Sequence, residues 1–282
     1  MAWADELVAV RMLPHALAYA KKGWRVLPVW WPKYPGVCSC RDAERCSSAG
    51  KHPIPMIAPD GVHSATSNPE IIRKWWDQYP LANIGIATGK VSGVTVLDID
   101  RRHDGHISME QLILRHGRPE QTPTAITGGD GRHIYWSWSK QHRCQQDVRA
   151  GIDVKSSGGY VLAAPSMHST GIRYKWHEEG HPGRVSVKAA PPWADLLLSG
   201  KQPGRIRKPV NGRSTPLPIG NFDEGVRNTN LFRYACRWQR QALTDEDIAN
   251  RVYDLNTKCK PPLRDREVER IIRSALKYEK GR

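Results

Sequence analysis

Three aspartates and a histidine have the residue types that metal-assisted phosphate chemistry requires, and two of the aspartates share one strand. The run from Val94 to Asp100 is largely apolar until its end, which predicts a buried strand. Because strand side chains alternate between faces, Asp98 and Asp100 would point the same way. Mg²⁺ or Mn²⁺ offsets the cost of burying two carboxylates, and paired cations about 4 Å apart suit in-line displacement at phosphorus. A strand end that emerges into solvent explains the short pattern equally well.

The third aspartate, Asp153, lies two residues before Lys155. Alternation puts these two side chains on one face of a strand, with Ile152 and Val154 on the other. The pair fits a surface ion pair, which contributes little to stability. It also fits a third metal ligand beside a lysine that meets a phosphate. The segment 156–159 fits either a hairpin turn or a phosphate-contacting loop.

The histidine, His133, follows a glycine-rich turn at 128–131 and Arg132. Such a turn exposes backbone N–H groups to phosphate oxygens, and the arginine adds a fork-shaped donor. Alternation places His133 opposite a core face made of Ile134, Trp136 and Trp138. A satisfied structural histidine is the other interpretation, and the pattern does not decide between the two.

A cysteine cluster has the composition of a structural metal site. Its spacing is C-x-C-x5-C-x5-H, and its members are Cys38, Cys40, Cys46 and His52. Three thiolates and one imidazole complete a tetrahedral Zn²⁺ site with no open position for catalysis. The alternative is a loop of reduced cysteines with a chance histidine.

The elements that must position these residues form an α+β chain with a largely antiparallel or mixed sheet. Ser67-Asn68-Pro69 predicts a helix start, because a capping side chain precedes a proline in the first turn. Expected helices cover 7–22, 67–79 and 107–116, and expected strands cover 25–29, 83–89, 94–100, 133–138, 151–154 and 160–164.

Two domains are expected. A segment rich in proline, glycine and arginine at 201–219 has no apolar period and predicts a linker. It would join a catalytic domain, residues 1–200, to a small helical domain, residues 220–282. Helices are expected in the second domain at 225–241, 244–255 and 265–279.

The charge of the chain points to a polyanionic partner. Its 282 residues include 43 lysines and arginines against 28 acidic residues, a net charge of +15. Nucleic acid is the first expectation and an acidic membrane surface the second, while an inert solubility charge is the alternative. No apolar run approaches the roughly 20 residues that cross a bilayer, and the acidic N-terminus lacks signal-peptide features. We therefore expect a cytoplasmic location and no membrane association.

Taken in order, these motifs resemble the bifunctional primase-polymerase (prim-pol) domain of phages and plasmids, which is related to the archaeal and eukaryotic small primase subunit. The resemblance covers roughly residues 12–196 and rests on the segments 83–89, 96–100, 131–133 and 151–166. It implies a sheet core related to RNA-recognition motifs (RRM-like) with a zinc-binding loop. The family's second motif often has serine two residues before its histidine. This chain has Gly131 there, so such a contact would have to come from backbone.

The resemblance also implies a role for each site residue. The catalytic Mg²⁺ or Mn²⁺ would be bound by Asp98, Asp100 and Asp153. The triphosphate of the incoming nucleotide would be held by His133, with Arg132 and Lys155 as helpers. The nucleotide or the template would be touched by Ser166 and His168. A similar cluster in relatives supports structural Zn²⁺ at Cys38, Cys40, Cys46 and His52.

The segment after the linker resembles the small helical domain that often follows prim-pol domains. The matching segments are 224–228, 256–263 and 267–275. The resemblance implies a role in priming through contacts with the phosphates of the template or primer end. A stabilising appendage is the alternative.

Together these features predict a DNA primase-polymerase that uses nucleoside triphosphates on a single-stranded DNA template. Two alternatives use the same residues differently. One is a metal-dependent nuclease or phosphohydrolase, and the other is a non-catalytic replication-initiation protein that binds single-stranded DNA. The chain has no Walker-type G-x4-G-K-[ST] loop, so any replicative helicase would be a separate chain or would lie beyond this sequence.

Overall fold

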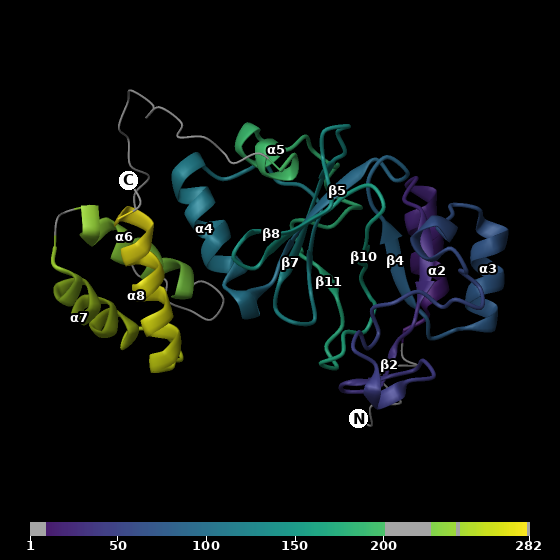
Figure 1. Cartoon of the computed structure of the whole chain (residues 1–282), viewed down its shortest axis with the longest axis horizontal. Coiled ribbons are helices and arrows are strands. Elements are labelled where there is room, and N and C mark those ends of the chain that lie inside the picture. Colours follow the sequence, from purple (N-terminus) through teal and green to yellow (C-terminus); the bar gives the residue numbers. More distant parts are fainter. Residues whose placement is uncertain (1–9, 201–226, 241–242, 281–282) are drawn as a thin grey trace. The chain divides into compact units, whose positions relative to one another are not determined.

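The computed structural model describes residues 10–200, 227–240 and 243–280 (Figure 1). Contacts divide the chain into two compact units. The sheet unit comprises Met1–His106 and Pro119–Gly204, and the helical unit comprises Ile107–Arg118 and Arg205–Arg282. The helical unit is therefore built from two separate stretches of sequence.

Two antiparallel sheets form the centre of the sheet unit. The large sheet has the strand order β11 (Lys175–Trp176), β6 (Thr124–Ile126), β7 (Arg132–Ser137), β5 (Val94–Ile99), β9 (Ile152–Lys155) and β8 (Gln145–Arg149). The small sheet has the order β1 (Val26–Val29), β4 (Asn83–Ala87) and β10 (Tyr160–Leu162). A separate short hairpin pairs β2 (Pro32–Tyr34) with β3 (Val37–Cys38).

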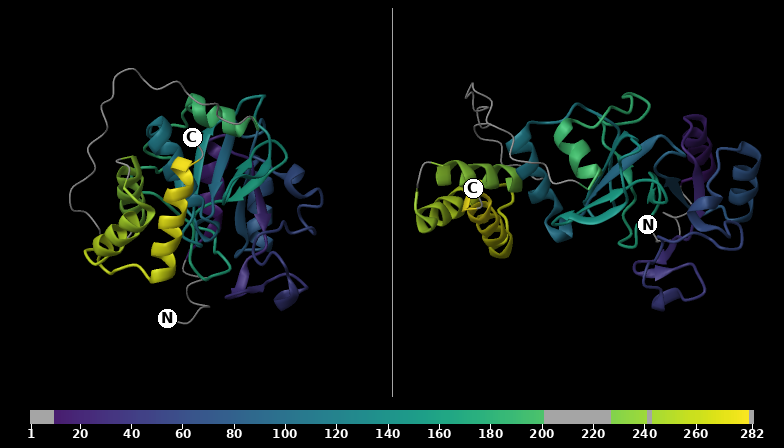
Figure 2. Two further views of the ribbon diagram at one scale, coloured as in Figure 1. Left: turned by 60° about the vertical axis from the view of Figure 1, so that its left-hand side comes forward. Right: turned by 45° about the horizontal axis from the view of Figure 1, so that its top comes forward.

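The face of the large sheet that carries Val96 and Tyr135 packs into the main core of the sheet unit, and both side chains are fully buried. Two helices, α2 (Met12–Lys21) and α3 (Pro69–Gln78), lie side by side against the small sheet and join that core (Figures 1 and 2). The helix α3 begins where expected, because the side chain of Asn68 accepts a hydrogen bond from the N–H of Glu70 at 2.9 Å.

The opposite face of the large sheet is covered by α5 (Pro192–Leu198), where Trp193 meets Trp136 edge-on at 6.2 Å between ring centroids. The described part of the sheet unit also contains three short 3₁₀ turns, η1 (Ala43–Arg45), η2 (Gly61–Ser64) and η3 (Arg101–His103). The central strand β5 is thus buried on both faces, as its apolar sequence predicted.

The helical unit contains α6 (Arg227–Arg240), α7 (Asp245–Asn256), α8 (Asp265–Lys280) and, from Ile107 on, α4 (Gly105–His116). Ile107 is buried in one apolar cluster with residues of the other three helices, among them Phe232, Val252 and Ile271. An ion pair inside this unit joins Arg233 Nε to Glu110 Oε1 at 2.5 Å. Both side chains are mostly buried, with exposed fractions of 14% and 8%.

The α+β class, the sheet core and the small helical domain are confirmed. The first helix starts later than expected, since residues 10 and 11 are not helical, and residues 7–9 lie outside the described part. The segment 156–159 does not close a hairpin, because β9 and β10 belong to different sheets. The expected linker and the start of the helix at 225 also lie outside the described residues. Among the helices that the structure describes, none combines the length and the apolar character that a membrane crossing requires.

Candidate active site and metal centre

Strand register brings two of the predicted aspartates and the histidine together. Asp98 on β5 pairs directly with Asp153 on β9 and with His133 on β7. Residues that are directly opposite on neighbouring strands share one face of the sheet. His133 is buried, and its Nε2 lies 3.4 Å from Oδ1 of Asp98. The centre of the large sheet therefore presents a carboxylate flanked by a second carboxylate and an imidazole.

Asp100 lies just beyond the end of β5 and caps the turn η3. Its carboxylate accepts hydrogen bonds from the backbone N–H and the guanidinium of Arg102, at 2.8 to 3.1 Å, and lies 3.0 Å from Nδ1 of His103. The Arg102 side chain, followed by its backbone N–H and by His103, outweighs the effect of burial and holds the pKa of Asp100 well below its usual range. This carboxylate is ionised under any ordinary condition.

Asp153 is oriented by two donors. Its Oδ1 accepts the backbone N–H of Asp147 at 2.9 Å, and its Oδ2 accepts from Nζ of Lys155 at 2.9 Å. Asp147 lies where the β8–β9 register shifts, and its φ of 48° is in the left-handed region that aspartate tolerates better than most residues. The irregular strand thus aims a backbone donor at the third carboxylate.

The three carboxylates line one cavity of about 280 Å³. Burial raises the pKa of Asp98, but the charges of His133, Lys155 and Lys51 lower it by more than burial raises it. The carboxyl is therefore ionised. Ionised carboxylates directly opposite each other destabilise a sheet unless a cation lies between them, and oxygen ligands suit Mg²⁺ or Mn²⁺. The donor set therefore fits divalent cations. The side chains are not gathered as tightly as a ligand cluster, because the carboxylate of Asp100 is turned toward Arg102 and His103.

Besides His133, two of the predicted nucleotide contacts line the cavities. His168 is buried at the wall of the first cavity, and its Nδ1 lies 2.9 Å from the hydroxyl of Thr170. Burial, then the charges of Lys51 and Arg102, lower the pKa of His168 to about 4. The imidazole is neutral near pH 7. Lys155 lines a second, adjoining cavity of about 830 Å³.

The structure does not bring the other two predicted contacts to either cavity. Arg132 is exposed and pairs with Ile99, so alternation places it on the face opposite to His133. Ser166 is fully buried, and its hydroxyl accepts from the N–H of Ile84 at 2.9 Å. That hydroxyl fastens the chain after β10 to β4.

Three residues that the sequence reading missed also line the first cavity: Lys51, Arg102 and Tyr174. Tyr174 is buried, and its ring lies between His133 and His168, with centroid distances of 5.7 and 5.9 Å. Arg102 is the second of two arginines that follow the Asp-x-Asp pattern, and this basic pair is a signal visible in the sequence. Lys51 lies directly before the predicted zinc ligand His52, and a single lysine at that position has no motif that would mark it as a site residue.

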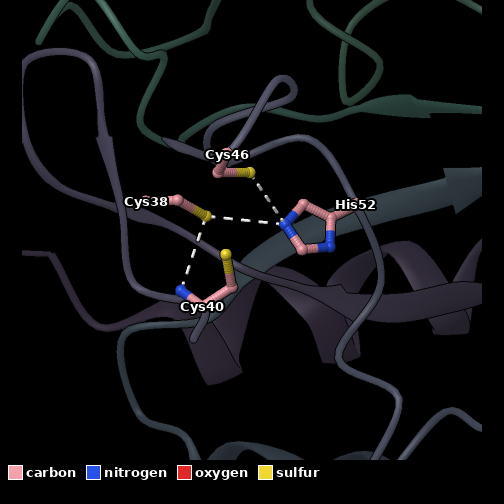
Figure 3. A group of neighbouring side chains, drawn as sticks. All are labelled: Cys38, Cys40, Cys46 and His52. Carbon is pink, nitrogen blue, oxygen red and sulfur yellow. Dashed lines mark hydrogen bonds between the residues drawn. The ribbon is translucent and has the colours of Figure 1, made fainter. Parts of the chain in front are cut away.

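The four residues of the cysteine cluster converge (Figure 3). The ligand atoms of Cys38, Cys40, Cys46 and His52 all lie within 4.8 Å of one another. Nε2 of His52 faces the sulfurs, 3.4 Å from that of Cys46 and 3.6 Å from that of Cys38. Bond lengths of about 2.3 Å for Zn–S and 2.0 Å for Zn–N in a tetrahedron imply an N···S separation of about 3.5 Å. The cluster therefore has the shape and chemistry of a Cys₃His zinc site.

The thiol of Cys38 is arranged to become a thiolate when a cation binds. Burial raises its pKa to about 11, whereas the N–H groups of Gly50 and Cys40, whose nitrogens lie 3.4 and 3.5 Å from its sulfur, act in the opposite direction. A bound cation deprotonates a coordinating thiol. The two N–H donors would then stabilise the negative sulfur.

Comparison with known families gives two matches. The family described as bifunctional DNA primase/polymerase, N-terminal, matches residues 16–193. The family described as primase C terminal 1 (PriCT-1) matches residues 216–281. No curated protein matches the chain. The first match contains every residue of the carboxylate site and of the cysteine cluster, and the second contains α6, α7 and α8.

Proposed function

Because the chain belongs to the bifunctional DNA primase/polymerase family, we propose that it synthesises primers and extends DNA by template-directed, metal-dependent nucleotidyl transfer. The two family matches establish a primase/polymerase-type function in DNA replication. The reaction, its metals and its residues are the proposal. It is carried by one observation, the direct pairing of Asp98 with both Asp153 and His133 at the centre of the large sheet.

The reaction joins a 3′-hydroxyl, from a primer end or a first bound nucleotide, to the α-phosphorus of a nucleoside triphosphate, and pyrophosphate leaves. Asp98, Asp100 and Asp153 would hold Mg²⁺ or Mn²⁺, which supply charge neutralisation at the phosphates and a more acidic attacking hydroxyl. The low pKa values of Asp98 and Asp100 keep these two carboxylates ionised, so they are ready to bind cations without first losing a proton.

His133 would hold the triphosphate from its place beside Asp98. Its Nδ1 is buried and has no hydrogen-bond partner among the residues that the structure describes. A buried ring nitrogen without a partner is costly, and a phosphate oxygen of a bound nucleotide would offset that cost if the side chain turned to expose this nitrogen. Lys155 would contribute a second cation, since it lies on the same strand face as Asp153. The roles first considered for Arg132 and Ser166 have no support in their positions.

Primer extension tests this proposal. The chain would be incubated with single-stranded template, nucleoside triphosphates and Mn²⁺, with and without a primer. Longer products are expected, and Asp98→Asn or Asp153→Asn should lower their rate by about 100-fold or more. Asp77→Asn, an exposed aspartate on α3, is the matched control. Synthesis that survives both active-site changes would refute the assignment of the site.

The same assay separates the alternatives. A shortened template would indicate a metal-dependent nuclease, and binding without synthesis would indicate a non-catalytic single-strand-binding protein. The proposed partners are a single-stranded DNA template, nucleoside triphosphates and a replicative helicase carried by another chain. The domain limits 1–200, 201–219 and 220–282 and the cytoplasmic location remain predictions.

A further inference from the structure

The segment from Cys38 to His52, called the zinc loop below, contributes two residues to the active-site cleft. Ser48 lines the larger cavity, and Lys51 lines both cavities. Only five residues are shared by the two cavities, namely Lys51, Asp98, His133, Gln146 and Tyr174. Lys51 therefore stands at the junction between the carboxylates and the larger cavity.

Lys51 differs from the other cations of the cleft in its partners. The ammonium of Lys155 is bound to Asp153, and the guanidinium of Arg102 is bound to Asp100. Within the described part of the chain, Lys51 makes no ion pair within 4.0 Å, and its side chain makes no hydrogen bond. It is partly buried. A half-buried, unpaired ammonium beside a cavity is available to an anion that enters it.

The backbone on either side of Lys51 is held at three successive carbonyl groups. That of Gly50 accepts from the side-chain amide of Asn83 at 3.1 Å, that of Lys51 from the hydroxyl of Tyr160 at 2.5 Å, and that of His52 from the N–H of Trp30 at 2.9 Å. These donors come from the small sheet and the residue that follows β1. The side chain of Lys51 is thus presented from a fixed backbone.

The cysteine cluster contacts this backbone on both sides of Lys51. The N–H of Gly50 points at the sulfur of Cys38, and His52 is itself a member of the cluster. Gly50 has a φ of 70° and lies so close to Pro32 that an added Cβ would come within 2.9 Å of its ring. Loss of a bound cation would remove one restraint on each of the residues immediately before and after Lys51, while the hydrogen bonds from Asn83 and Trp30 would remain.

The two cavities, of about 280 and 830 Å³, share lining residues and together offer enough volume for a nucleoside triphosphate. The larger has the volume of an ordinary small-molecule pocket and suits a nucleoside, while the smaller holds the carboxylates at which the reacting phosphorus must lie. The phosphates would then pass the junction. We propose that Lys51 binds the triphosphate of the incoming nucleotide, and that the zinc loop acts as its positioning element. The inference rests on the proposed nucleotidyl transfer.

The first test compares Lys51→Ala with the control Lys33→Ala. Lys33 is an exposed lysine on β2, the strand that precedes the zinc loop. Lys51→Ala should raise the KM for dATP and weaken dATP binding, measured by calorimetry with Ca²⁺, by about tenfold or more. Lys51→Arg should recover part of the loss. Binding of deoxyadenosine, which has no phosphate, should be unchanged. Equal losses for dATP and deoxyadenosine, or no loss for either, would overturn the phosphate contact.

The second test concerns the zinc loop. Cys46→Ser should raise the KM for dATP in the wild-type background. It should raise the KM little further in the Lys51→Ala background, because both changes remove the same contact between Lys51 and the triphosphate. Additive effects in the double variant would refute the positioning role while leaving the phosphate contact intact. Circular dichroism confirms that each variant is folded. A wild-type chain that binds dATP but makes no product would refute the proposed nucleotidyl transfer rather than the phosphate contact of Lys51.

Discussion

The buried ion pair between Arg233 and Glu110 provides a sharp test of the helical unit. Arg233→Ala would leave the Glu110 carboxylate, which is 8% exposed, without its partner on a helix that packs into the apolar cluster of the unit. Breaking a buried pair on one side costs about 3 to 5 kcal/mol. That is a rise of more than 100-fold in the opening equilibrium of the unit. Arg233→Met combined with Glu110→Leu should recover most of the loss, because an apolar pair of similar volume fits the same site.

Amide hydrogen exchange read by mass spectrometry follows this unit separately from the sheet unit. Peptides from α6, α7, α8 and α4 should exchange faster together in Arg233→Ala, while peptides from β5 and β7 should be unaffected. Arg273→Ala, an exposed arginine on α8, is the matched control and should change stability by less than about 0.5 kcal/mol. If α4 kept its protection while α6 and α8 lost theirs, the assignment of α4 to the helical unit would be refuted.

Three further outcomes are expected. Cys46→Ser should lower the zinc content measured by atomic absorption, whereas Cys144→Ser, which lies outside the cluster, should leave it unchanged. Folding lowers the pKa of His168 from 6.5 to about 4, so the unfolded chain binds more protons than the folded chain between these pH values. The free energy of unfolding should therefore be highest above pH 6.5 and should fall as the pH is lowered toward 4. His168→Gln should flatten this acid-side loss in urea unfolding at successive pH values. Gly89→Ala should destabilise far more than Gly93→Ala in the same assay. Both glycines have positive φ, but an added Cβ at Gly89 would meet backbone at 2.3 Å and one at Gly93 would meet nothing within 4 Å.

Local periodicity predicted the strands that carry Asp98, Asp153 and His133, and the family resemblance implied that these residues act together. The strand register places all three on one sheet face. Each of these residues lies on a strand whose alternation is visible in the sequence, so their shared face follows once the strands pair. Arg132 illustrates the limit of such reasoning. It neighbours His133 in sequence, and for that reason alternation sends it to the other face. Two residues that are adjacent in a strand therefore point to opposite faces of the sheet and cannot contact the same ligand on one face.

Other features depended on contacts that no local pattern encodes. Lys51 reaches the cleft because a metal loop, Tyr160 and Asn83 fix its backbone from distant parts of the chain. The irregularity at Asp147 that aims an N–H at Asp153 has no strong sequence signal, since β8 is largely polar and exposed. The hydroxyl of Ser166 was read as a ligand contact, but tertiary packing places it against the backbone of Ile84.

The split make-up of the helical unit limits how the chain can be rearranged. A cut at the expected linker would detach α6, α7 and α8 but leave residues 107–118, the fourth helix of their core, inside the remaining piece. During synthesis, α4 emerges more than a hundred residues before its partners and must wait for them with an apolar side uncovered. A functional swap between relatives has to carry both stretches, and substitutions in α4 are expected to co-vary with α6 and α8 rather than with the neighbouring strand.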